Sequence, residues 1–66
     1  MEFVYVLLPN RAEWHEITVL LTEEEALQAS IDHPACRVEI FEKKETGSGY
    51  IPTRNYFRKG KWIHGQ

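Results

Sequence analysis

The sequence predicts a small α+β protein with one sheet of four to five strands and a single helix on one face, in the order ββαββ with a short fifth strand. Several segments alternate apolar and polar residues, as half-buried strands do. Only one segment carries the signature of a helix start. The length of 66 residues, with 42% apolar and 27% charged residues, fits a single globular domain over residues 1–66.

Two strands are predicted before the helix. Residues 3–8 are β-branched, aromatic or aliphatic, and the turn-forming Pro9 follows them. Residues 16–21 alternate and are expected to pair with the first strand. We expect the buried face of this second strand to carry Ile17, Val19 and Leu21, with Leu20 on the other face.

The helix is predicted to begin at Thr22, where residues 22–25 form a capping box. The expected bonds join the Thr22 hydroxyl to the Glu25 amide and the Glu25 carboxylate to the Thr22 amide. Three glutamates at residues 23–25 also oppose the positive end of the helix dipole, which explains the run without a catalytic or metal-binding role. Pro34 ends the helix. One apolar stripe is expected, made of Ala26, Leu27, Ser30 and Ile31.

Three further segments complete the predicted sheet. Residues 36–42 alternate, with Cys36, Val38 and Ile40 on one face and Arg37, Glu39 and Phe41 on the other. Residues 50–58 and 61–64 form a hairpin around the tight turn of Lys59 and Gly60. Across this turn we expect Arg58 to face Lys61, Phe57 to face Trp62 and Tyr56 to face Ile63. Alternation places Phe57 and Trp62 on the core side, and Tyr50, Arg54, Tyr56 and Arg58 on the other face. Pro52 cannot donate a ladder hydrogen bond, so this strand is expected to be an edge strand or bulged near its start.

Charge is divided unevenly along the chain, although the net charge is only −2. All ten acidic residues lie in residues 1–45, where four basic residues leave a net charge of −6. Residues 46–66 hold the other four basic residues and no acid, a net charge of +4. This asymmetry favours either a surface that binds anions or docking of one copy on another.

The basic hairpin is the predicted ligand-binding site. Guanidinium groups grip phosphate with two hydrogen bonds, and phenol rings stack on bases. We therefore expect a non-enzymatic protein that binds or sequesters a small phosphate-bearing ligand such as a nucleotide signal; the alternative for this face is a merely solvated hairpin surface. Four positive charges are few for duplex DNA, whereas single-stranded nucleic acid stays possible. The predicted ligand-binding residues are Tyr50, Arg54, Tyr56, Arg58 and Lys61.

A second hypothesis is a protein-interaction module, such as an inhibitor of a host protein. One helix cannot cover both faces of the sheet, and apolar residues recur on both faces of the first three strands. A homodimer or higher oligomer would cover them and would also enlarge a small core. The predicted interface residues are Trp14, Leu20 and Phe41, with Trp14 either an interface anchor or a lid on the core edge.

Several function classes are excluded at this stage. Cys36 is the only cysteine, which favours a reducing, cytoplasmic setting, and its ligand-like spacing from His33 does not make a four-ligand zinc site. No metal, cofactor or catalytic residue is expected, because no phosphate loop, dinucleotide fingerprint or nucleophile elbow is present. The longest apolar run, residues 3–8, is too short to cross a membrane.

Three segments together resemble small proteins encoded by large DNA viruses and phages, a group with no assigned activity. They are residues 16–26, 37–41 and 49–56, and the resemblance extends over residues 16–60. It implies a context in which very small proteins bind and sequester host molecules, and it implies no role for any particular residue.

Overall fold

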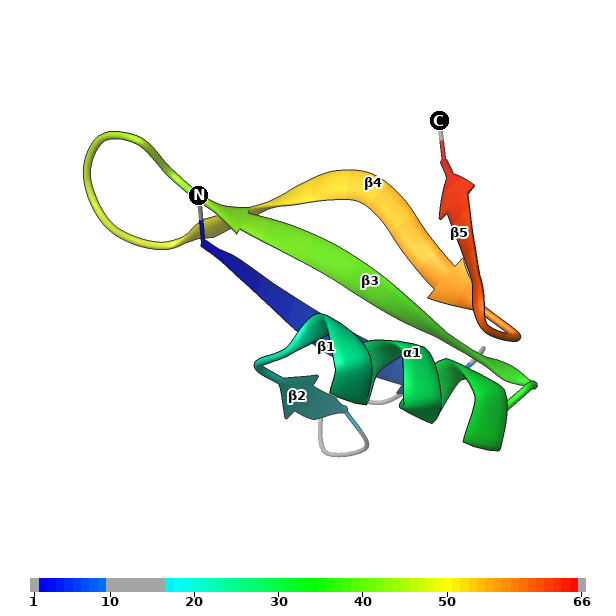
Figure 1. The fold of residues 1–66 in the computed structure, drawn as a ribbon. Coiled ribbons are helices and arrows are strands. Elements are labelled where there is room, and N and C mark those ends of the chain that lie inside the picture. The colour runs from blue at the N-terminus through cyan, green and yellow to red at the C-terminus, as the bar shows by residue number, and fades with distance from the viewer. Residues whose placement is uncertain (1, 10–16, 66) are drawn as a thin grey trace.

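The computed structural model describes residues 2–9 and 17–65 and confirms a small α+β fold with one helix and a five-stranded sheet (Figure 1). All neighbouring strands are antiparallel, and their order across the sheet is β2-β1-β3-β4-β5. The elements are β1 (Phe3–Pro9), β2 (Thr18–Leu20), α1 (Glu23–Asp32), β3 (Cys36–Lys43), β4 (Tyr50–Arg58) and β5 (Lys61–His64).

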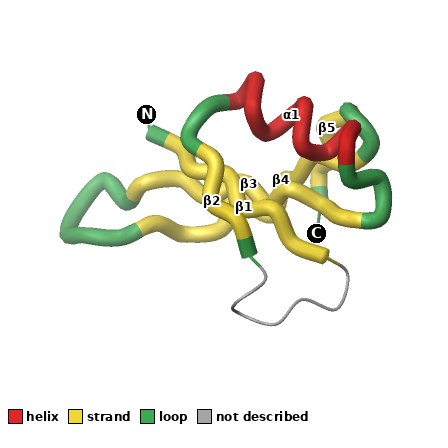
Figure 2. The backbone as a smooth tube through the Cα atoms, turned by 90° about the horizontal axis from the view of Figure 1, so that it is seen from below, coloured by secondary structure: helices red, strands yellow, loops and turns green. Residues whose placement is uncertain are grey.

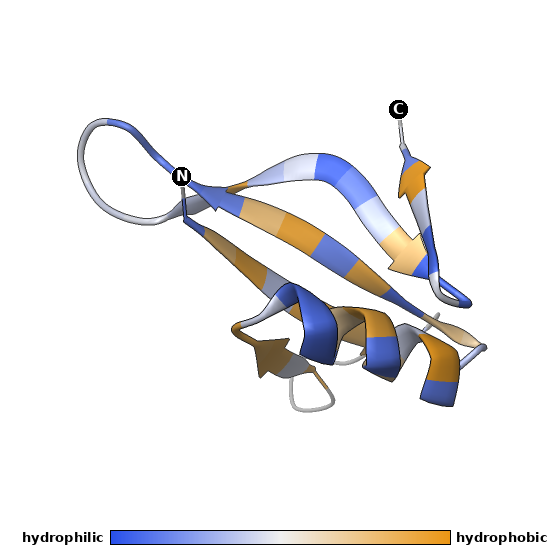
Figure 3. Ribbon diagram, in the orientation of Figure 1, coloured by the Kyte–Doolittle hydropathy of each residue, from blue (hydrophilic) through white to orange (hydrophobic). Residues whose placement is uncertain are grey.

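The core lies between α1 and one face of the sheet, on which α1 packs (Figure 2). Apolar and polar residues alternate along much of β3 (Figure 3), and its residues Val38 and Ile40 belong to the core on the side of α1. The opposite face carries no helix among the described residues. The buried core cluster consists of Tyr5, Ala26, Val38, Ile40 and Phe57.

The helix start follows the sequence prediction, with one different bond. The backbone N–H of Glu25 donates to Thr22 Oγ1 over 3.2 Å, and the Thr22 hydroxyl donates to Glu25 Oε1 over 2.9 Å. The Glu25 carboxylate thus bonds the Thr22 hydroxyl rather than its amide. The helix ends at Asp32, and of its predicted stripe Ala26 and Ser30 are fully buried.

The predicted faces of the second strand are reversed in the structure. β2 has only three residues, and Leu20 pairs with Tyr5 on the side of α1, where it packs against the core. Val19 and Leu21, expected inside, are exposed. The prediction was wrong because alternation in an apolar run fixes which residues share a face but not which face is buried.

The hairpin turn between β4 and β5 is fastened to the helix. Lys59 and Gly60 both have positive φ, 53° and 77°, as in the tight turn that matches the twist of paired strands. The Gly60 N–H donates to the Ser30 hydroxyl oxygen over 2.9 Å, and that hydroxyl donates to the Leu27 carbonyl over 2.7 Å. The buried Ser30 therefore links α1 to the end of the hairpin.

β4 is bulged directly after Pro52, as the proline predicted. On β3, Phe41 pairs with Pro52 but Glu39 pairs with Tyr56, so the three residues 53–55 stand opposite one. Beyond the bulge the predicted cross-strand pairs are confirmed: Tyr56 with Ile63, Phe57 with Trp62 and Arg58 with Lys61.

Side chains replace the ladder hydrogen bonds that the bulge interrupts. The Thr53 hydroxyl donates to the Ile40 carbonyl over 2.9 Å and accepts from the Asn55 N–H over 3.1 Å. Arg54 has a φ of 70°, a left-handed conformation that is rare for an arginine. Its carbonyl accepts from the Gly65 N–H over 2.7 Å, which ties the end of the chain to the bulge.

Candidate functional site

Three of the five predicted ligand-binding residues lie together on the face of the sheet opposite α1. Arg58 and Lys61 are direct partners across the hairpin. Tyr56 is two residues before Arg58 on the same face, beside Ile63 of β5. This face of the hairpin therefore presents two cations next to a half-buried phenol ring.

The other two predicted residues lie elsewhere on β4. Tyr50 is at the far end of the strand, paired with Lys43, and its hydroxyl donates to Glu2 Oε2 over 3.3 Å. Lys43 Nζ also lies 3.8 Å from Glu2 Oε1, so the tyrosine belongs to a separate polar cluster. Arg54 is exposed within the bulge, which interrupts the regular alternation that had placed it between Tyr50 and Tyr56.

Arg37 is a third cation beside the hairpin pair and was not among the predicted ligand-binding residues. It directly precedes Val38, which pairs with Phe57, just as Arg58 directly follows Phe57 on the antiparallel strand. Alternation had already placed Arg37 on the outer face, but its nearness to Arg58 requires the strand register. We refer to Arg37, Arg58 and Lys61 as the cationic row.

One carboxylate moderates the charge of the cationic row. Arg37 Nε donates to Glu39 Oε2 over 2.6 Å, with both residues half-buried. A guanidinium has five N–H donors, so this bond leaves other donors of Arg37 for a ligand. Glu39 also pairs with Tyr56, which places the carboxylate next to the phenol ring. Among the described residues, three cations against one acid make this part of the face positive.

The three predicted interface residues do not form one surface in the described structure. Phe41 lies on the face opposite α1, half-buried between its partners Val4 of β1 and Pro52 of β4. Leu20 packs on the opposite side, against the core. Trp14 lies outside the described residues. Of the two described residues in this set, Phe41 is the one that lies where a partner on the face opposite α1 would contact it.

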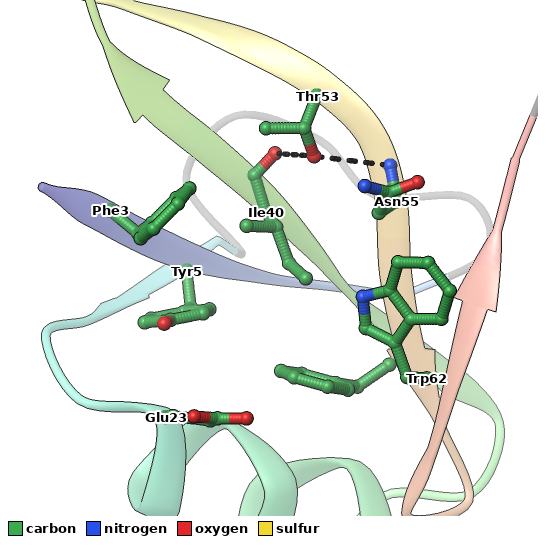
Figure 4. A pocket seen from close by; sticks show the side chains of 8 residues that line it. Phe3, Tyr5, Glu23, Ile40, Thr53, Asn55 and Trp62 are labelled. Atoms are coloured by element: carbon green, nitrogen blue, oxygen red, sulfur yellow. Dashed lines mark hydrogen bonds between the residues drawn. The ribbon is translucent and has the colours of Figure 1, made fainter. Parts of the chain in front are cut away.

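A pocket of about 230 Å³ opens on the α1 side of the sheet, and the sequence analysis did not find it (Figure 4). Its floor is made of the core residues Tyr5, Ile40 and Phe57, which come from three adjacent strands. Its walls come from four different elements, so no single segment reveals it. The wall residues are Phe3 of β1, Glu23 of α1, Thr53 and Asn55 of the β4 bulge and Trp62 of β5. We call it the Trp62 pocket.

The bulge fixes the amide of Asn55 at the wall of the Trp62 pocket. His64 Nδ1 lies 2.6 Å from Asn55 Oδ1, so the imidazole N–H donates to the amide oxygen. The two donors of the Asn55 amide nitrogen have no partner among the described residues. His64 also stacks on Trp62, with ring centroids 6.0 Å apart, and so supports the indole that forms the adjoining wall.

Tyr5 has a raised pKa in the Trp62 pocket. Burial of the phenol is the larger cause, and the negative charge of Glu23 is the second, since both disfavour the phenolate. Because the folded-state pKa lies above the ordinary 10.0, the stabilising contribution of the neutral phenol is complete below that pH and is lost as the pH rises through the raised pKa.

We therefore expect alkaline loss of stability that depends on Tyr5. Urea unfolding followed by circular dichroism between about pH 8 and 11 should show the free energy of unfolding falling more steeply with pH in the wild type than in Tyr5→Phe. Only the wild type has a phenol at this position that ionises in the unfolded chain while the folded protein keeps it neutral. Equal slopes for wild type and Tyr5→Phe would contradict the assignment.

Within residues 2–9 and 17–65, no three histidine, cysteine or acidic side chains gather closely enough to hold a metal ion. Cys36, at the start of β3, is half-buried and has no disulfide. None of the described helices is long and apolar enough to span a bilayer.

Comparisons with models of known protein families, with curated proteins and with solved structures found no match. The two candidate sites, the cationic row and the Trp62 pocket, are therefore interpreted from their geometry and chemistry.

Proposed function

We propose that the protein binds a small phosphate-bearing ligand, such as a nucleotide, at the cationic row and holds it without changing it chemically. The observation that carries this proposal is the direct pairing of Arg58 with Lys61, with Arg37 beside them. Like charges directly opposite each other destabilise a sheet. A domain of 66 residues has little stability to lose. A bound anion would offset the repulsion between these cations, which explains why the fold places them together.

The neighbouring groups favour a small anion. Tyr56 lies next to the row and offers a ring on which a base can stack. The bond between Arg37 and Glu39 holds one guanidinium in place, which lowers the entropy lost when a phosphate binds. Duplex DNA, by contrast, depends on neutralising many phosphates, and three cations beside one carboxylate provide little of that.

The test compares two double variants with the same change of charge. Binding of ATP, AMP and inorganic tripolyphosphate is measured by calorimetry for the wild type, for Arg58→Glu/Lys61→Glu and for Lys43→Glu/Lys44→Glu, which changes the far end of the sheet. We expect the first double variant to weaken binding at least tenfold, whereas the second stays close to the wild type.

Thermal unfolding gives a second readout of the same row. Lys61→Glu replaces a like-charged pair with an opposite pair across the hairpin, so we expect its melting temperature to match or exceed that of the wild type while phosphate binding falls. Failure of all three phosphate probes to bind the wild type, or equal weakening by the two double variants, would refute the proposal.

A second candidate is self-association through the same face of the sheet. Val4, Val6 and Leu8 of β1 and Phe41 of β3 lie there half-buried, and no described helix covers them. A second copy would remove this apolar area from water. Native mass spectrometry of the gently purified protein should then show an oligomer that Phe41→Glu dissociates, and a wild-type monomer would rule this candidate out. Retained small ligands would appear as added mass in the same spectrum.

A further inference from the structure

The Trp62 pocket is independent of the cationic row. The pocket lies on the α1 side of the sheet, and the cationic row lies on the opposite side, so neither site contains a residue of the other. The two sites also differ in charge. Among the residues that the structure describes, Glu23 is the only charged one that lines the Trp62 pocket, and α1 adds Glu24, Glu25 and Asp32 without any basic residue. A phosphate would be repelled here, whereas a cation would be attracted.

Aromatic side chains supply most of the pocket's apolar surface. Tyr5 and Phe57 stack side by side in the floor, with ring centroids 6.1 Å apart and planes inclined by 25°. Phe3 stands at one end and Trp62 at the other (Figure 4). Faces of Trp, Tyr and Phe attract alkylated ammonium groups through their ring quadrupoles.

Trp62 is a large aromatic residue that the fold leaves exposed. Its side chain is 57% exposed, although it is the direct cross-strand partner of Phe57, which is 3% exposed. Stacking on His64 and the hydrogen bond from that imidazole to Asn55 hold the indole at the rim. A large aromatic group held rigidly but left exposed is typical of binding surfaces.

The carboxylate of Glu23 selects among apolar ligands. It has no hydrogen-bond or ion-pair partner among the described residues, and it lies near enough to Tyr5 to act on the charge of the phenol. Glu23 is exposed, so an uncharged apolar ligand would displace only part of its hydration, but that ligand would gain no charge pairing from the carboxylate. A ligand with a positive charge pairs with it.

We propose that the Trp62 pocket binds a small organic cation, an amine or quaternary ammonium group carried on a short body. Its volume of about 230 Å³ is below the roughly 300–1,000 Å³ of pockets that take drug-sized ligands, so the ligand is small. The ammonium group lies between Glu23 and the rings of Trp62 and Tyr5. The free amide donors of Asn55 meet an oxygen atom on the ligand.

Choline and its uncharged isostere 3,3-dimethylbutan-1-ol are the probes, because they have the same shape and hydroxyl group and differ only in charge. Binding is followed by NMR on the Trp62 indole N–H and on amide signals around the pocket. We expect millimolar concentrations of choline to move these signals, and the uncharged isostere to bind at least tenfold more weakly.

Two substitutions and two matched controls test the pocket residues. Glu23→Gln and Trp62→Ala should each weaken choline binding at least fivefold. Glu24→Gln removes the same charge from the next residue of α1, which does not line the pocket, and Arg58→Glu/Lys61→Glu changes only the other face; both should bind choline like the wild type. Choline should also shift the titration of Tyr5 to lower pH, because it offsets the charge of Glu23.

Three results would overturn the proposal: no movement of the Trp62 indole signal with choline, equal binding of the isostere, or equal effects of Glu23→Gln and Glu24→Gln. The first two mean that the pocket does not select a cation, and the third means that only the general negative field of α1 acts. Since phosphate binding at the cationic row is measured separately, either proposal can fail while the other holds.

Discussion

Replacing Phe57 with alanine should leave about half or more of the protein unfolded at room temperature. Phe57 is 3% exposed, packs against Tyr5 and belongs to the buried cluster that joins the sheet to α1. Removing a buried phenylalanine side chain costs about 3–5 kcal/mol. A domain of this size has about 3–5 kcal/mol of stability in total, so the substitution removes nearly all of it.

Trp62→Ala is the matched control, because Trp62 is the partner of Phe57 across the hairpin and is a larger side chain. Its exposure of 57% means that less than half of its area is buried in the folded protein, and we expect a loss of about 1–2 kcal/mol, smaller than the loss at Phe57. Urea unfolding followed by circular dichroism compares the two variants. A folded Phe57→Ala protein with wild-type stability would show that the core lies elsewhere.

The contrast between Phe57 and Trp62 also marks the limit of what the sequence predicts. Alternation and the two-residue turn correctly placed both residues on the α1 side of the sheet and correctly paired them. They did not show that one is buried and the other exposed, because burial depends on how far a ten-residue helix extends over the sheet. The elements and their order were thus predictable, but the part of the sheet that α1 covers was not.

The candidate site was predicted in part for a similar reason. Tyr56, Arg58 and Lys61 are close along the hairpin, so local pairing rules bring them together. Arg37 joins them only through the register between β3 and β4, which depends on the bulge at residues 53–55. The Trp62 pocket draws its walls from four elements, and such a meeting of distant residues has no local signal in the chain.

Substituting Gly60 with alanine should destabilise the protein by about 2–3 kcal/mol, for two reasons that can be separated. First, Gly60 has a φ of 77°, a left-handed conformation that costs a non-glycine residue roughly 1–2 kcal/mol. Second, a Cβ atom there would stand 2.9 Å from Ile31 Cγ1, closer than two carbon atoms pack. Either the Ile31 side chain or the hairpin turn must shift, and a shift of the turn would lengthen the hydrogen bond from the Gly60 N–H to Ser30.

A double-mutant cycle with Ile31→Ala separates the two causes. Ile31 is 55% exposed, so its truncation alone should cost little. In that background Gly60→Ala keeps the backbone strain but loses the contact, and we expect its effect to fall by about 1 kcal/mol. Equal effects of Gly60→Ala in both backgrounds would show that the turn does not rest on Ile31. Because Arg58 and Lys61 flank this turn, the same cycle measured by phosphate binding tests whether docking of the hairpin on α1 positions the cationic row.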